Sequence, residues 1–129
     1  GTEHHSFVIF PRRLRKRLLP HYNKRCSINQ ITWQVGSLRE VVDGFNWLNS
    51  RGVKIIRSGR DNPGSNWHAY PLDPEGHTNE IYYGIEQIGW DGRPRPASQR
   101  PRIDNDRWPE YVDAASDAFA GEVFLGPYN

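Results

Sequence analysis

Side chains that can bind a metal ion or move a proton are concentrated in one short stretch, residues 65–87. This stretch contains an imidazole at His68, a phenol at Tyr70 and a carboxylate at Glu80. Imidazole and carboxylate groups ligate metals and act as general acids and bases, and a phenol hydroxyl can hydrogen-bond a polar substrate. Whether they can act together depends on the backbone that carries them.

A turn between these residues predicts which of them share a face. Asp73, Pro74 and Gly76 fit a type I turn that ends in a glycine free to adopt a left-handed conformation, which favours a β-hairpin with a three-residue loop and a bulge. In that register Asp73 lies opposite His77. Because side chains alternate along a strand, three further facing pairs share one face. These pairs are Leu72 with Thr78, Tyr70 with Glu80, and His68 with Tyr82.

The opposite face of this hairpin is more apolar and should pack on a helix. It carries Trp67, Ala69, Ile81 and Tyr83. A plainer alternative is an edge hairpin whose polar side chains simply face water, and spacing alone leaves both interpretations open.

Length and composition restrict the class of protein. A chain of 129 residues with 36% hydrophobic residues is long enough for one domain with a core. The single cysteine, Cys26, excludes an internal disulfide framework and fits a reducing cytosol. No apolar run approaches the roughly 18 residues of a membrane span. We therefore expect a cytoplasmic protein with no membrane partner.

Positive charge is clustered near the start of the chain, although the net charge is only +2. The cluster consists of Arg12, Arg13, Arg15, Lys16 and Arg17, followed by Lys24 and Arg25. No aromatic residues interleave it and no nucleic-acid motif surrounds it, so we expect a solvated basic face or a surface for an acidic partner, and no nucleic acid.

The remaining elements follow from hydrophobic periodicity. Residues 5–10 (HSFVIF) suit a buried or edge strand, and residues 11–20 suit one or two helical turns. Residues 29–35 alternate, with Gln30, Thr32 and Gln34 on a polar face and Ile31, Trp33 and Val35 on a packed face.

A helix should follow this strand. Ser37 and Glu40 form a capping box, apolar residues continue at helical spacing, and Gly52 suits the C-terminal left-handed position. Residues 53–57 then predict a strand and residues 58–64 a turn.

The order of elements predicts an α+β fold. Residues 29–88 form a βαβββ unit, a curved mixed sheet with a helix on its convex face. Residues 1–28 supply a strand and a basic connection from a preceding unit, and residues 89–129 a Pro/Arg-rich tail with a short helix from residue 108 to 119. The chain contains no methionine, so we expect it to be part of a longer protein.

Three segments resemble the vicinal oxygen chelate superfamily of glyoxalases, bleomycin-resistance proteins and type I extradiol dioxygenases. They are EHHSFVIF at residues 3–10, INQITWQVGSLREV at residues 28–41 and SNWHAYPLDPEGHTNEIYYG at residues 65–84. Extradiol dioxygenases are the most similar group. The resemblance implies a divalent metal, Fe(II) or alternatively Mn(II), held by two histidines and a glutamate.

The resemblance also implies residue roles. Glu80 would be the acidic metal ligand, His5 the acid and base toward substrate oxygen, and Tyr70 a hydrogen-bond donor to the substrate. Gln30 stands where a histidine ligand is expected, and an amide oxygen is a weaker ligand than an imidazole. The other histidine would come from a strand that precedes this chain.

Further residues on the polar face are candidate substrate contacts: His68, Tyr82 and Thr32. His68 is alternatively a substitute ligand or a plain cross-strand partner of Tyr82. The resemblance thus predicts a ring-cleaving dioxygenase that acts on a catechol-like aromatic.

Two other functions remain open. One is a binding module that holds a small aromatic ligand without redox chemistry, and the other is a dimerising interaction domain with a degenerate site. Exposed strand edges favour a homodimer, or the remainder of a longer chain, in all three cases.

Overall fold

The computed structural model describes residues 3–18, 28–60, 64–88, 92–100, 103–104, 108 and 123–124. The main elements are α1 (Arg12–Leu18), β1 (Gln30–Gln34), α2 (Leu38–Ser50), β2 (Ile55–Arg60), β3 (Trp67–Pro71) and β4 (Thr78–Tyr83). Shorter elements follow: β5 (Gln87–Ile88), a 3-10 turn (Ala97–Gln99), β6 (Ile103–Asp104) and β7 (Val123–Phe124).

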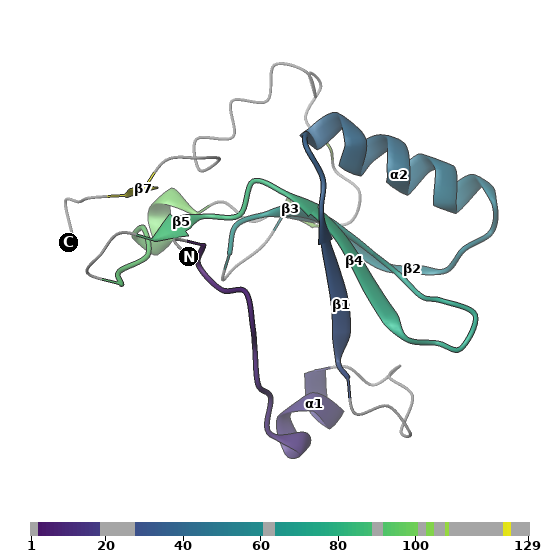
Figure 1. Ribbon diagram of the computed structural model, residues 1–129, viewed down its shortest axis with the longest axis horizontal. Coiled ribbons are helices and arrows are strands. Elements are labelled where there is room, and N and C mark those ends of the chain that lie inside the picture. Colours follow the sequence, from purple (N-terminus) through teal and green to yellow (C-terminus); the bar gives the residue numbers. More distant parts are fainter. Residues whose placement is uncertain are drawn as a thin grey trace.

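The fold is α+β, with a mixed sheet that is not closed and a helix packed on it (Figure 1). The strand order is β1-β4-β3-β2-β6, and two-residue β6 extends the four longer strands at one edge. Strand β1 is parallel to β4, and the other neighbours are antiparallel. A separate parallel pair joins β5 to β7.

Helix α2 begins and ends as the sequence predicts. The backbone N–H of Glu40 donates to Ser37 Oγ at 3.2 Å, which satisfies one of the free donors of the first turn. The Glu40 carboxylate accepts in return from the backbone N–H of Gly36 at 2.6 Å. Gly52 has a φ of +73°, which terminates the helix in the left-handed region that glycine adopts readily.

The β3–β4 hairpin has the predicted turn and register. The backbone N–H of Asp73 donates to the His77 carbonyl at 3.0 Å, and Gly76 has a φ of +82°. The Asp73 carboxylate accepts from the backbone N–H groups of Glu75 and His77 at 3.0 and 2.8 Å. His68 faces Tyr82, and Leu72 faces Thr78 through an isolated bridge. The facing pairs expected from the turn are therefore confirmed.

The apolar face of the hairpin packs on α2. Leu38 and Val41 of the helix form a buried cluster with Trp67, and Tyr83 packs against it. Gly44 allows this close approach, because a Cβ at that position would lie 2.8 Å from Ile81 Cδ1.

Trp108 also covers this cluster, in contact with both the helix and the sheet. Its ring centroid is 5.5 Å from that of Phe45 and 6.2 Å from that of Trp67. A residue from the tail thus completes the core on this side.

Strand β2 lies later in the chain than expected. Residues 58–60, predicted as part of a turn, continue the strand and pair with β3. A bulge between Ile55 and Ser58 accommodates the change in register, and Gly59 adopts a φ of +115°. Cross-strand pairing therefore overrides the turn preference of Ser-Gly.

Residues 5–10 do not form the expected strand. The backbone pairs with another segment only before this stretch. Glu3 forms a bridge with Gln87, and the His4 backbone N–H donates to the Glu86 carbonyl at 2.8 Å. Residues 6–10 are exposed and lead into α1, which confirms the predicted helical turns. The periodicity identified a strand-like segment, but it carries no information about a partner.

The packed face expected for residues 29–35 is confirmed only at Val35, which packs against the buried cluster. Ile31 and Trp33 are exposed, because α2 lies over β3, β4 and β2 and does not reach β1 at the edge. Polar Gln30 and Thr32 alternate with them as predicted.

Some expectations concern residues outside the described part of the chain. They are the connection at residues 21–27 and the short helix after Trp108. Among the described residues, no helix is both long enough and apolar enough to cross a membrane.

Candidate functional site

The candidate site is the polar face of the sheet, opposite α2, and it is centred on the carboxylate of Glu80. The hairpin register carries His68 and Tyr70 of β3 and Glu80 and Tyr82 of β4 to this face. Parallel pairing of β1 with β4 sets Thr32 against Glu80. Strand β1, which is distant in the sequence, and the two strands of the β3–β4 hairpin therefore meet at one carboxylate.

Glu80 is only 4% exposed, and both of its oxygens accept hydrogen bonds. Gln30 Nε2 donates to Oε2 at 2.7 Å, and Thr32 Oγ1 donates to the same oxygen at 3.0 Å. Asn66 Nδ2 donates to Oε1 at 2.9 Å. The Tyr70 hydroxyl is a fourth donor. A carboxylate accepts about four hydrogen bonds, so its capacity is filled by protein groups.

The pKa of Glu80 is raised above its ordinary value, chiefly because burial penalises the charged form. Hydrogen bonds from Tyr70, Thr32 and Asn66 and the positive charge of Arg57 act in the opposite direction. Desolvation prevails, so the protein holds this carboxyl in a state that takes up a proton more readily than it would in water.

Tyr70 lies between a cation and an imidazole. The Arg57 guanidinium is 4.5 Å from its ring centroid, and the His68 ring is 4.8 Å away in an edge-to-face arrangement. Burial and the negative charge of Glu80 raise the pKa of Tyr70 above its ordinary value of 10.0. The phenol therefore stays protonated and remains a hydrogen-bond donor at neutral pH.

His68 is buried next to Tyr70, and a hydrogen bond fixes the orientation of its ring. Its Nδ1 lies 3.2 Å from the backbone carbonyl of Asn66, which can accept only, so Nδ1 carries the proton. Asn66 thus fixes the His68 ring through its carbonyl and Glu80 through its side chain.

Sequence reasoning missed two site residues, Asn66 and Arg57. Asn66 precedes β3 in a loop where Ser65 has a φ of 53°, a conformation that costs free energy outside glycine. Arg60 Nε holds that loop by donating to the Ser65 carbonyl at 2.7 Å. The sequence around Ser65 offers no signal for this positive φ.

His5 lies in a second cluster at the N-terminal end of the described chain. Its Nδ1 is 3.1 Å from His4 Nδ1, and burial lowers its pKa while the charge of Glu3 acts against this. The Tyr82 hydroxyl donates to Glu3 Oε1 at 3.5 Å, and burial raises the pKa of Tyr82 to about 12. Tyr82 therefore connects this cluster to the Glu80 face.

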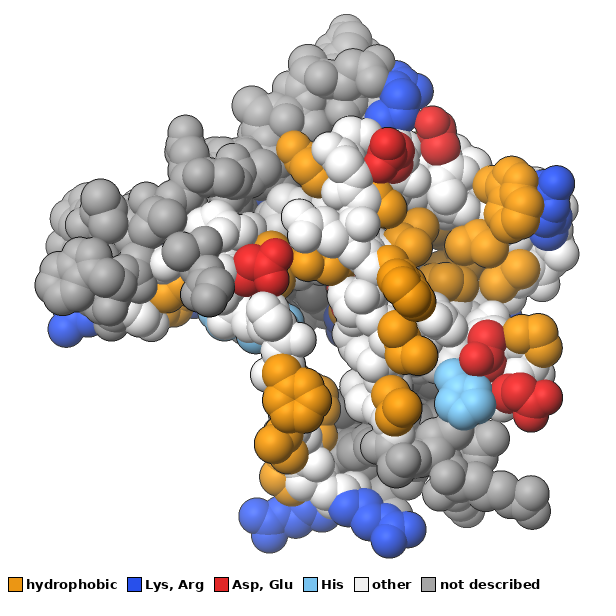
Figure 2. All heavy atoms as spheres, in the orientation of Figure 1, with side chains coloured by type: hydrophobic (Ala, Val, Ile, Leu, Met, Phe, Trp, Pro, Cys, Tyr) orange, Lys and Arg blue, Asp and Glu red, His pale blue; other side chains and the backbone are white. Residues whose placement is uncertain are grey.

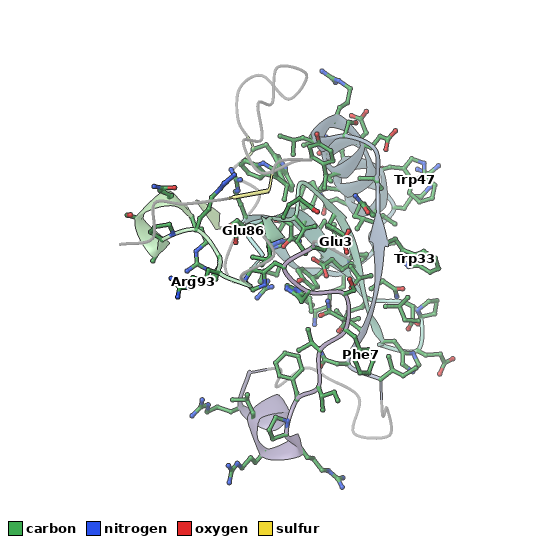
Figure 3. All side chains as sticks on the ribbon, turned by 60° about the vertical axis from the view of Figure 1, so that its left-hand side comes forward. Glu3, Phe7, Trp33, Trp47, Glu86 and Arg93 are labelled. Atoms are coloured by element: carbon green, nitrogen blue, oxygen red, sulfur yellow. The ribbon has the colours of Figure 1, made fainter. Side chains whose placement is uncertain are left out.

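Glu86 organises the neighbouring loops behind this second cluster. The side chain is fully buried, and Oε1 accepts from the backbone N–H of Arg95 at 2.6 Å. Its backbone N–H donates to the Gly64 carbonyl at 2.8 Å. In Figure 3 Glu86 lies on the left of the sheet and Trp33 and Trp47 on the right, with Glu3 between them. These contacts fix the N-terminal residues to the sheet.

The described residues by themselves supply at most two of the metal ligands that the resemblance implies, Glu80 and Gln30, and these two are hydrogen-bonded to each other. Within the described ranges, no group of three or more His, Cys, Asp or Glu side chains is placed to hold a metal ion. Gln30 also directs its amide nitrogen toward Glu80, whereas a metal ligand would offer its amide oxygen. A metal here requires ligands from elsewhere and a rotated Gln30.

Comparisons of the chain with protein-family models, curated proteins and solved structures give no match. A function has to be inferred from the geometry of the Glu80 face and from the chemistry of its side chains.

Proposed function

We propose that the Glu80 face binds a small aromatic molecule through hydrogen bonds and ring contacts, without redox chemistry. The observation that supports this is the full set of donors around Glu80, namely Gln30, Thr32, Asn66 and Tyr70. Because the carboxylate oxygens accept hydrogen bonds from neutral amide and hydroxyl groups, they fix the orientation of those groups. Such rigid polar groups next to aromatic rings are typical of ligand sites.

The groups next to Glu80 account for the class of ligand. Tyr70 presents a half-buried ring that packs on the buried His68 ring, and Arg57 adds a cation over the Tyr70 ring. A planar aromatic ligand can contact the Tyr70 ring, and a hydroxyl on the ligand can hydrogen-bond the oxygen of Tyr70. Catechol and phenol are suitable probes, because they differ by one hydroxyl group.

Replacing Tyr70 with phenylalanine should weaken catechol binding by about two- to tenfold, since one hydrogen bond contributes roughly 0.5–1.5 kcal/mol. Isothermal titration calorimetry measures this affinity. Tyr83→Phe is the matched control because Tyr83 lies on the opposite face against the helix, and its affinity should equal that of the wild type. Equal affinities in Tyr70→Phe and the wild type, or no catechol binding at all, would contradict the proposal.

The second candidate is the metal-dependent ring-cleaving dioxygenase that the resemblance implies. One observation favours it: Gln30, Tyr70 and Glu80, all named by that resemblance, are in hydrogen-bond contact. In this function a longer polypeptide or second chain would supply the missing strand and its histidine ligand for Fe(II) or Mn(II), next to Glu80 and Gln30. Tyr70 would orient the substrate hydroxyl and His5 would move a proton.

Metal analysis and oxygen uptake distinguish the two candidates. The dioxygenase predicts about one Fe or Mn ion per site and oxygen consumption with catechol, both lost in Glu80→Ala. The binding module predicts a catechol affinity that EDTA does not change. A loss of catechol binding on chelation would favour the dioxygenase.

A further inference from the structure

The exposed N-terminal arm, residues 6–10, is the first of two elements that have no partner strand on one side within the described part of the chain. Phe7 is 83% exposed and Ile9 is 80% exposed, and no strand within the described chain pairs with them. Val8 and Phe10 are exposed as well. Aromatic and β-branched residues favour a strand, so the arm has the composition of a strand but lacks a neighbour.

The second unpartnered element is the outer edge of β1. In the described residues β1 pairs with β4 alone, which leaves the backbone groups on its other side open to another strand. Ile31 and Trp33 are 46% and 58% exposed on this strand. In Figure 2 the apolar side chains of the arm and those over β1 appear on the same face of the molecule.

The two elements match in spacing. Phe7 and Ile9 are two residues apart, as are Ile31 and Trp33, and side chains two apart on a strand share one face. A strand formed by the arm next to β1 can therefore place both arm residues over the two exposed apolar residues of β1. This pairing would satisfy the open backbone N–H and C=O groups of β1 and would also bury the apolar side chains of both strands.

We propose that the arm of one chain adds to the β1 edge of a second copy, and that the reciprocal contact completes a homodimer by strand exchange. Within one chain the start of the arm is fixed by the bond from the His4 backbone N–H to the Glu86 carbonyl, and the arm forms no ladder with its own β1. Two copies have no such restraint on their relative position. Reciprocal exchange uses the same surface twice, as a two-fold dimer requires.

A membrane surface is the competing occupant of the arm. Arg12 and Arg13 follow it after Pro11, and apolar residues beside basic ones also bind anionic lipid. The matched spacing and the open strand edge favour a second copy, because a lipid surface explains neither of them.

Disulfide trapping tests the exchange in the full chain. In a Cys26→Ser background, Ile9→Cys is combined with Ile31→Cys in one variant and with Trp33→Cys in another. A disulfide forms only when two Cα atoms come within about 7 Å. We expect at least one variant to give a covalent dimer on a non-reducing gel. Ile9→Cys with Asn46→Cys is the control, since Asn46 is exposed on α2, and it should stay monomeric.

An intramolecular disulfide, or no disulfide in either variant, overturns the proposal. Sedimentation equilibrium supplies an independent measurement with Phe7→Asp, which should weaken dimerisation at least tenfold, whereas Asn46→Asp should leave it unchanged. Circular dichroism verifies that both variants are folded. A wild-type protein that is monomeric and sediments with phosphatidylserine vesicles would assign the arm to lipid instead.

Discussion

Replacing Glu80 with alanine should lower the free energy of unfolding by on the order of 3 kcal/mol. Hydrogen bonds to charged groups contribute about 1.5–3 kcal/mol each, and water molecules that enter the vacated space can accept some of the hydrogen bonds that Glu80 accepted. The side chains of Gln30, Thr32 and Asn66 lose their shared acceptor in this variant. Urea denaturation followed by circular dichroism measures the change. A loss below about 1 kcal/mol would mean that these donors readily find other partners.

The glutamine variant separates the charge of Glu80 from its shape through the pH dependence of stability. Burial raises the pKa of Glu80 above 4.5, so the folded protein binds this proton more tightly than the unfolded chain does. This stabilisation is complete below pH 4.5 and is lost as the pH rises through the folded-state pKa. Lowering the pH from neutral toward 4.5 should therefore stabilise the wild type relative to Glu80→Gln.

The same scan in the variant serves as the control for other titrating groups. The pKa of Glu86 is also raised by burial, and those of His4 and His5 are lowered, and all three are present in both proteins. A stability difference that does not change with pH would contradict the raised pKa of Glu80.

Trp67→Ala should lower the free energy of unfolding by about 3–5 kcal/mol, the range for truncating a buried tryptophan in a packed core. Trp67 joins the helix to the sheet through Leu38 and Val41, and its ring also contacts Trp108. Loss of the ring leaves a cavity at the centre of the only cluster that covers this face in the described chain. Thermal and urea denaturation should both show the loss.

Trp47→Ala is the matched control for this core substitution. Trp47 lies on the same helix but is 55% exposed, and its ring faces the Arg51 guanidinium at 4.0 Å. An exposed cation–π pair contributes about 0.5–1 kcal/mol, so the expected loss is several times smaller. Similar losses in the two variants would contradict the assignment of the core.

The local features of the hairpin and the helix were predictable from the sequence. The turn from Asp73 to Gly76 fixes the register by its own hydrogen bonds, and this register sets Tyr70 beside Glu80. Ser37 and Gly52 similarly mark the ends of α2. In each case the signal lies within a few residues of the structure that it determines.

Features that depend on partners distant in the sequence were not predictable. Periodicity shows that residues 5–10 and β1 are strand-like, but it does not specify that the former lack a neighbour or that α2 stops short of Trp33. Asn66 was missed for the same reason, because its contact with Glu80 depends on the path of the loop before β3.

Parallel pairing of β1 with β4 has a consequence for the order in which the protein folds. Thr32 and Glu80 are 48 residues apart, whereas Ala69 and Ile81 meet across a short hairpin. Closing the longer segment costs more chain entropy, so we expect the hairpin to form before β1 docks on it. The half of the Glu80 face that comes from β1 should then assemble after the hairpin half, and a ligand that contacts both halves would favour the docked state.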